Sequence, residues 1–279
     1  MLTRIILLLM IMTANTVTPQ GKGQYAKVNG INMYYEIHGS GHPLVLIHGG
    51  GSTLQTTFGT IMPLLAKTHQ VIAVELQSHG HTSNRDTPET FEQDADDVAA
   101  LLKQLGITAA DIFGFSNGGN TAMQIAIRHP QCVRKLVLAS AFYKREGLYP
   151  WFWDFMKEPK IEMMPQIYKD KYLEINPGNL TGLQAMHDND ARRMQGFKDW
   201  KDEYLKAIKA PAFIIIGDRD VVRPEHAVEM LHLINNSRLA ILPGDHGSYI
   251  GEIMTPNPDS TAMAYFVAQV NDFIAAPIP

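Results

Sequence analysis

The stretch Ile112-Phe113-Gly114-Phe115-Ser116-Asn117-Gly118-Gly119-Asn120 decides the fold of this chain. A short apolar run ends in the pattern Gly-x-Ser-x-Gly, and an amphipathic segment follows directly. This order predicts a strand, a sharp turn and a helix, with Ser116 at the tip of the turn in a strained backbone conformation. Gly114 and Gly118 are needed because a Cβ at either position would collide with the neighbouring strand or helix. Ser116 is therefore the candidate nucleophile, although such a pentapeptide alone also occurs in loops that bind nothing.

Apolar runs on both sides of this stretch predict a sheet. Residues 25–28 and 31–37 are β-rich and are joined through Asn29-Gly30, a strong signal for a tight hairpin. Other apolar runs lack alternation, as is typical of parallel strands that are buried on both faces. They lie at 44–47, 71–74, 112–115, 135–139, 213–216 and 239–242. Helical patterns between them imply an α/β fold with a mostly parallel sheet covered on both faces.

One of these helices has a clear start signal. The segment from Phe91 to Leu105 is amphipathic, and Thr90 and Gln93 are spaced as a capping box. We therefore expect a helix that begins at Phe91.

Length and composition limit the function classes. The chain has 279 residues, of which 45% are hydrophobic, enough for one large core. Its formal net charge is -4 and it contains no lysine or arginine run, so nothing favours nucleic acid as a partner. The single cysteine, Cys132, excludes an internal disulfide, and we expect it to pack as a small apolar residue.

The first twenty residues differ from the rest. Arg4 precedes the apolar block 5–12, which is followed by the small and polar residues 13–16. This layout is typical of a secretory signal peptide, and the apolar block is too short to span a bilayer. We expect residues 1–20 to contain a signal peptide, cleaved so that the mature protein begins between Ala14 and Gln20, and residues 21–279 to form one domain. The mature protein is expected to be secreted or periplasmic without stable membrane insertion. An uncleaved anchor or an unstructured extension remains the alternative.

The interval from about 142 to 209 contains no buried strand and is rich in aromatic residues and methionines. We predict a helical insertion over one edge of the sheet, and we expect most of its large apolar side chains to form its own core. Trp151, Phe152 and Trp153 are harder to bury in so small a unit. They are candidates for the substrate pocket.

A serine nucleophile needs a base and a third group that orients the base. Asp218 and Asp220 follow the strand at 213–216, and His246 follows the strand at 239–242. Loops at the carboxyl ends of strands are where such a sheet collects its active site. We assign His246 as the base and Asp220 as its partner, because Asp220 lies further along the loop. Asp218 is expected to cap or to pair with Arg219.

Other histidines have weaker claims. His48, His79 and His81 all precede Ser116 and are expected to brace loops. The run 187–190, His-Asp-Asn-Asp, could ligate a metal in principle, but it lacks a clustered third ligand and a recognised spacing. We therefore predict no metal.

The stretch His48-Gly49-Gly50-Gly51 supplies an expected oxyanion hole. Backbone amides stabilise the negative oxygen that forms when a serine attacks a carbonyl, and glycines allow the backbone to come close. We expect one donor to be the amide of Asn117, at the start of the helix, and the other to be the amide of Gly50 or of Gly51.

From about Val28 to Phe273 the chain resembles an α/β-hydrolase with a helical lid inserted after the sixth strand. The resemblance rests on five stretches in family order, at 48–51, 75–82, 114–118, 220–224 and 246. It implies an eight-stranded sheet whose second strand is antiparallel, a triad of Ser116, Asp220 and His246, and no cofactor. Glu75 departs from the aspartate that many members carry.

This resemblance implies hydrolysis by acyl transfer. The expected substrate is a carboxylic ester of a small, partly apolar molecule. Lactones and the carbon–carbon bonds of ring-cleavage products are the alternative, since related members cleave them. A non-catalytic member that binds a small apolar ligand is the alternative from another class. The sequence leaves the oligomeric state open.

Overall fold

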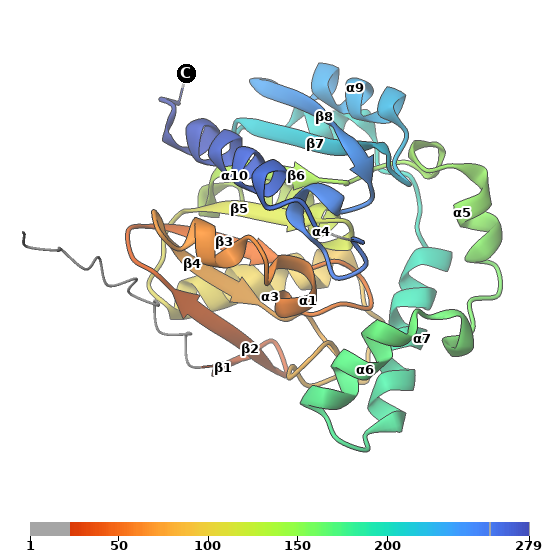
Figure 1. The fold of residues 1–279 in the computed structure, drawn as a ribbon. Coiled ribbons are helices and arrows are strands. Elements are labelled where there is room, and N and C mark those ends of the chain that lie inside the picture. Colours follow the sequence, from red (N-terminus) through yellow and green to blue (C-terminus); the bar gives the residue numbers. More distant parts are fainter. Residues whose placement is uncertain (1–22, 257, 279) are drawn as a thin grey trace, which may run out of the picture.

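The computed structural model describes residues 23–256 and 258–278, so the expected signal peptide lies outside the described residues. The described part forms an eight-stranded sheet in the order β1-β2-β4-β3-β5-β6-β7-β8 (Figure 1). The strands are β1 (Gln24–Val28), β2 (Ile31–His38), β3 (His42–Ile47), β4 (His69–Val74), β5 (Ala110–Phe115), β6 (Val133–Ala139), β7 (Ala212–Arg219) and β8 (Ser237–Asp245). Each apolar run that was predicted to belong to the sheet lies within one of these strands.

Strand β2 is antiparallel to both of its neighbours, β1 and β4, and the pairs from β4 to β8 are parallel. The turn between β1 and β2 has positive φ angles at Asn29, 42°, and at Gly30, 91°. Two successive positive φ angles are typical of the tight hairpin turn that matches the twist of the strands. The predicted eight-stranded sheet with an antiparallel second strand is confirmed.

Two hydrophobic cores cover the two faces of the sheet. In β3, Val45 and Ile47 point into one core, while Leu44 and Leu46 point into the other, and all four are buried. This alternation follows from the two-residue period of a strand. Figure 1 shows α10 (Ser260–Ala275) and α3 (Phe91–Gln104) on opposite sides of the sheet. The remaining helices outside the interval between β6 and β7 are α1 (Leu54–Phe58), α2 (Met62–Leu65), α4 (Asn117–Arg128) and α9 (Pro224–Leu233).

The start of α3 corrects one prediction. Thr90 caps the helix, since its Oγ1 accepts a hydrogen bond of 3.0 Å from the backbone N–H of Gln93. The side chain of Gln93 donates instead to the carboxylate of Asp97 at 2.9 Å. Only the Thr90 half of the expected capping box is therefore formed, because a buried carboxylate one turn along the helix attracts the glutamine amide.

A helical insertion lies between β6 and β7, and its first three α-helices stand together at one end of the sheet (Figure 1). Its α-helices are α5 (Pro150–Phe155), α6 (Gln166–Ile175), α7 (Leu180–Gln195) and α8 (Asp202–Lys206). Its own core is small, because only Tyr172, Leu183 and Met186 form a separate buried cluster. The expectation that most of the large apolar side chains would form that core is wrong. Several join the core of the sheet instead, among them Met194, Phe197 and Trp200.

No helix in residues 23–256 and 258–278 combines the length and the apolar character needed to cross a bilayer.

Candidate active site

Ser116 lies at the turn between β5 and α4 with φ 55° and ψ -123°, a conformation that L-residues rarely adopt. The flanking glycines make this turn possible. A Cβ on Gly114 would come within 2.0 Å of the carbonyl oxygen of Gly118, and one on Gly118 within 2.1 Å of the carbonyl oxygen of Ile47. Neither position can therefore carry a side chain, and the strained serine is held by close packing on both sides.

The structure brings His246 and Asp220 together with Ser116. The Nε2 atom of His246 lies 3.1 Å from the Oγ atom of Ser116. Its Nδ1 atom lies 2.6 Å from the Oδ1 atom of Asp220. The three side chains come from the carboxyl ends of β5, β7 and β8, and they form one continuous chain of hydrogen bonds.

Asp220 and Asp218 have different surroundings. Asp220 is buried and accepts backbone hydrogen bonds from Val222 at 3.1 Å and from Gly217 at 3.2 Å. Asp218 is exposed and accepts one from Gly244 at 2.8 Å. The expected pairing of Asp218 with Arg219 is wrong. Arg219 pairs with Asp245 instead, at 3.4 Å, because β7 and β8 place these two side chains side by side.

Ser140, which no pattern in the sequence indicated, completes the surroundings of Asp220. It follows β6 with φ 51°, and its hydroxyl donates a hydrogen bond to Asp220 Oδ2. The same hydroxyl lies 2.6 Å from the phenolic oxygen of Tyr249. Burial raises the pKa of Asp220, but His246, Ser140 and the amide of Val222 outweigh it and hold that pKa below its usual value. Asp220 is thus an anion.

The electrostatics of His246 follow from the same contact. Burial lowers the pKa of His246, but the carboxylate of Asp220 outweighs that effect, so the pKa is raised above its usual value. Glu252 adds a smaller contribution in the same direction.

The glycine loop lies against the serine, since a Cβ on Gly49 would lie 3.3 Å from the Cβ of Ser116. His48 orients this loop. Its Nε2 atom accepts from the amide of Leu76 at 3.0 Å, so its Nδ1 atom carries the proton and donates to the carbonyl of Gly49 at 2.7 Å. Burial lowers the pKa of His48 to about 3, so it stays neutral. Because C=O and N–H point in opposite directions across a trans peptide, the N–H of Gly50 faces away from His48.

The structure distinguishes between the amides of Gly50 and Gly51. The amide of Gly51 donates to the Oδ2 atom of Asp190 at 2.5 Å. Within the described residues, the amides of Gly50 and Asn117 have no hydrogen-bond partner. Those two amides are therefore available to a ligand. Asp190, on α7, was considered from the sequence only as a possible metal ligand, and its contact with the loop was missed.

A cavity of about 230 Å³ lies between Ser116 and the insertion. Of the three predicted pocket residues, only Phe152 lines it. Trp151 is 56% exposed. Trp153 is held away because its indole N–H donates to the carbonyl of Arg145 at 2.6 Å and its ring stacks on Phe197. Other large apolar side chains that line the cavity include Phe155, Met156, Met163, Met164 and Met194.

The run at 187–190 does not gather its side chains around one point. The Nδ1 atom of His187 lies 3.0 Å from Asp188, while Asp190 contacts His79 and Gly51. In the part of the chain that the structure describes, no three histidine, cysteine or carboxylate side chains cluster as metal ligands would.

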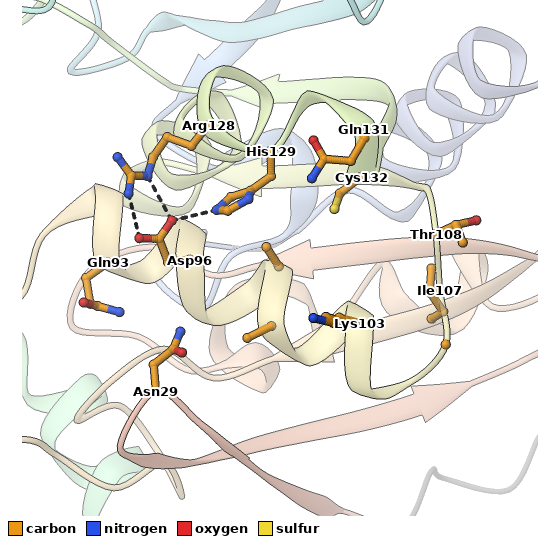
Figure 2. Close-up of a pocket in the computed structure, with 13 residues that line it drawn as sticks. Asn29, Gln93, Asp96, Lys103, Ile107, Thr108, Arg128, His129, Gln131 and Cys132 are labelled. Atoms are coloured by element: carbon orange, nitrogen blue, oxygen red, sulfur yellow. Dashed lines mark hydrogen bonds and ion pairs between the residues drawn. The ribbon is translucent and has the colours of Figure 1, made fainter.

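A larger hollow of about 1060 Å³ lies on the surface beside α3 and α4, away from Ser116 (Figure 2). Three of its polar side chains bind one another, because Asp96 contacts both Arg128 and His129 (Figure 2). Cys132 lines its edge, and burial raises the pKa of the thiol, so the cysteine is not activated. Nothing there resembles a reaction centre.

Comparison with known proteins gives a consistent picture. A family model described as alpha/beta hydrolase fold matches residues 42–164. A 2-hydroxy-6-oxo-6-(2'-aminophenyl)hexa-2,4-dienoic acid hydrolase of Metapseudomonas resinovorans is 24% identical over 91% of this chain and 93% of its own length. A pimeloyl-(acyl-carrier protein) methyl ester esterase of Neisseria meningitidis is 29% identical over 71% of this chain and 83% of its own.

Solved structures share the fold. The enol-lactonase from Burkholderia xenovorans LB400 superposes with a TM-score of 0.70 at 22% identity, covering 91% of this chain and 100% of the lactonase. A meta-cleavage product hydrolase from Pseudomonas fluorescens gives a TM-score of 0.74 at 22% identity, covering 91% of this chain and 97% of that one. These relatives include esterases, lactonases and carbon–carbon hydrolases, so they do not select one substrate.

Proposed function

The chain belongs to the α/β-hydrolase fold family and is a hydrolase, and on that premise we propose that it is a serine hydrolase that cleaves a carboxylic ester of a small, partly apolar substrate. The observation that carries the proposal is the chain of hydrogen bonds from Ser116 through His246 to Asp220, at 3.1 and 2.6 Å. A serine hydroxyl becomes nucleophilic when an oriented base removes its proton.

The proposed reaction proceeds through an acyl-enzyme. Ser116 Oγ forms a bond to the carbonyl carbon while His246 Nε2 takes the serine proton. His246 then gives that proton to the leaving alcohol as the bond between carbon and the alcohol oxygen breaks. Water attacks the acyl-enzyme with His246 again acting as base, which frees the acid and restores Ser116. Asp220 holds Nδ1–H and stabilises the imidazolium. The proposal needs no metal or organic cofactor.

The oxyanion of each tetrahedral intermediate is proposed to bind the amides of Asn117 and Gly50. Both amides are without a partner in the described residues, whereas the amide of Gly51 is engaged by Asp190. His48 supports this assignment because its bond to the carbonyl of Gly49 fixes the peptide that carries the N–H of Gly50. Each such donor lowers the barrier by about 3 kcal/mol.

The dimensions and lining of the cavity support a small, partly apolar acyl group. A volume of about 230 Å³ lined by phenylalanine and methionine side chains suits a short chain. Lactone or carbon–carbon bond hydrolysis is a second candidate, favoured by the enol-lactonase fold and by the dienoic acid hydrolase among the relatives.

We propose in addition that residues 1–20 form a cleaved signal peptide and that the mature protein is secreted or periplasmic. This rests on Arg4 and the apolar block 5–12. Residues 21–279 would then form one hydrolase domain, with the insertion at about 142–209 acting as its lid.

A fluorophosphonate probe and a panel of nitrophenyl esters of rising chain length test the function. The wild-type protein should be labelled once and should hydrolyse short esters faster than lactones or ring-cleavage dienones. Ser116→Ala should abolish both labelling and turnover. Ser83→Ala, which changes an exposed serine far from the cavity, should leave both intact. An unlabelled wild-type protein would indicate a non-catalytic ligand-binding member, and faster turnover of lactones or dienones would favour the second candidate.

A further inference from the structure

Asp190 is the one carboxylate among the described residues that line the cavity beside Ser116. It lies at the nucleophile end. Its Oδ2 atom accepts from Gly51 at 2.5 Å, and a Cβ on Gly50 would lie 3.2 Å from the same oxygen. A substrate with its carbonyl oxygen at the amides of Gly50 and Asn117 would therefore have this carboxylate close to its acyl group.

Two buried cations keep Asp190 ionised. The Nδ1 atom of His79 faces the carbonyl of Gln77 at 2.7 Å, and its Nε2 atom faces the carboxylate of Asp190 at 3.0 Å and the amide of Gly51 at 3.2 Å. An imidazolium, which donates from both nitrogens, satisfies both of these acceptors. Burial alone would lower the pKa of His79, but Asp190 raises it to about 9. Arg193 pairs with Asp190 and also with Asp94, at 2.7 Å.

These cations lie behind the carboxylate as seen from the cavity. The side chains of His79 and Arg193 are 0% and 2% exposed, and neither lines the cavity, whereas that of Asp190 is 14% exposed. The hydrogen-bonded N–H groups of His79 and Arg193 are directed at Asp190 and at other buried acceptors, while Nε of Arg193 has no hydrogen-bond partner among the described residues. Lys160 and His187 also line the cavity, but both come from the insertion and neither bonds to the glycine loop. A ligand at the nucleophile end therefore meets a negative charge and not a cation.

Asp190 can exchange one of its hydrogen bonds for a bond to a ligand. A carboxylate offers about four lone-pair sites. Gly51 and His79 occupy Oδ2, while Oδ1 binds Arg193 closely and receives the side-chain amide of Asn117 at the long distance of 3.4 Å. A donor on the substrate can replace that weak contact at little cost.

We propose that Asp190 determines substrate specificity, selecting acyl groups that carry a hydroxyl or ammonium donor near the scissile carbonyl and rejecting those that carry a carboxylate there. The proposal rests on the proposed serine hydrolase function and narrows its substrate class. It also separates this chain from its dienoic acid hydrolase relative, whose name gives an acid as the substrate.

Three nitrophenyl esters with four-carbon acyl groups test the proposal: butanoate, 2-hydroxybutanoate and hemisuccinate. For the wild-type protein, kcat/KM should be highest for the hydroxy ester and at least about 100-fold lower for the hemisuccinate, because like charges at a desolvated site repel strongly. Asp190→Asn should reduce the ratio of kcat/KM for the hydroxy ester to kcat/KM for the hemisuccinate at least tenfold, chiefly by raising turnover of the hemisuccinate. Asp188→Asn, which changes a carboxylate on the same helix that lies outside the cavity, should leave the ratio unchanged.

Each outcome decides the matter. Hydrolysis of the hemisuccinate within about threefold of the butanoate, or an unchanged ratio in folded Asp190→Asn, would overturn the role of Asp190. Should that variant not fold, the wild-type preference between the hydroxy ester and the butanoate decides, because an apolar cavity without Asp190 would favour the butanoate. If all three esters are hydrolysed with similar kcat/KM, the role of Asp190 is refuted while the proposed serine hydrolase function stands. If no ester is hydrolysed and Ser116 is not labelled, the proposed function fails and the inference falls with it.

Discussion

Replacing Asp220 with asparagine isolates the contribution of one charge to the proposed mechanism. The carboxylate lies 2.6 Å from Nδ1 of His246, and its side chain is 0% exposed. Two unit charges about 4 Å apart interact by about 4 kcal/mol at an effective dielectric constant of about 20. Since each 1.36 kcal/mol changes a rate about tenfold, losing this stabilisation of the imidazolium should lower kcat/KM by about three orders of magnitude.

The asparagine amide also disturbs the hydrogen bonds. If its NH2 group faces His246, Nδ1 must become an acceptor, and the proton moves to Nε2, where it blocks removal of the serine proton. If the NH2 group faces the other way, it meets the amide of Gly217. An unsatisfied buried donor costs about 1–3 kcal/mol, so some loss of stability is expected as well.

The assay is kcat/KM for a short nitrophenyl ester across pH, with the Tm measured on the same samples. Because Asp220 raises the pKa of His246, the residual activity of Asp220→Asn should have its midpoint at a lower pH than the wild type. Asp218→Asn is the control and should lose less than about tenfold, since the side chain of Asp218 bonds only to the amide of Gly244 at the surface. Equal losses in the two variants, or a midpoint that does not move, would refute the assignment of Asp220.

Four further outcomes are expected. Wild-type kcat/KM should rise with pH through one ionisation above the ordinary histidine value, because Asp220 raises the pKa of His246 and the base must be neutral; EDTA should not change the profile. Phe152→Ala should alter the chain-length preference in the ester panel more than Trp151→Ala, because Phe152 lines the cavity and Trp151 does not. The Tm should fall as pH rises from about 6.5 to about 9 and then level off, because the raised pKa of His79 adds stability that is lost as its imidazolium deprotonates. Amino-terminal sequencing of protein from the native host should begin between residues 14 and 20, and deleting residues 1–19 should leave activity intact; an unprocessed Met1 in the exported fraction would contradict cleavage.

The features that could be predicted from the sequence are those that depend on neighbouring residues. The sharp turn at Ser116 requires small residues two positions away on each side, so five consecutive residues are enough to predict it. The hairpin at Asn29-Gly30 is local in the same way, and it is found. The order of the strands that carry Asp220 and His246 then placed both side chains at one edge of the sheet.

The insertion could not be predicted to the same depth, because its side chains are placed by contacts with distant segments. Trp151 and Trp153 have similar neighbours in the sequence, yet one is exposed and the other is fixed by Arg145. Asp190 and Arg193 are three residues apart on one helix, as a surface ion pair would be. Only the approach of α7 to the glycine loop brings Asp190 into the cavity wall, with Arg193 buried behind it.

The same non-local contacts explain how a carboxylate can lie beside a site that must stabilise a negative oxygen. Alone, Asp190 would oppose the oxyanion at the amides of Gly50 and Asn117. Protonated His79 and Arg193, which both bind Asp190, offset part of its charge, and the amide of Gly51 is held in place by Asp190. The exposed edge of the carboxylate can then discriminate among acyl groups at short range, while its opposition to the oxyanion is reduced. Removing either cation should therefore harm catalysis more than removing the charge of Asp190 itself.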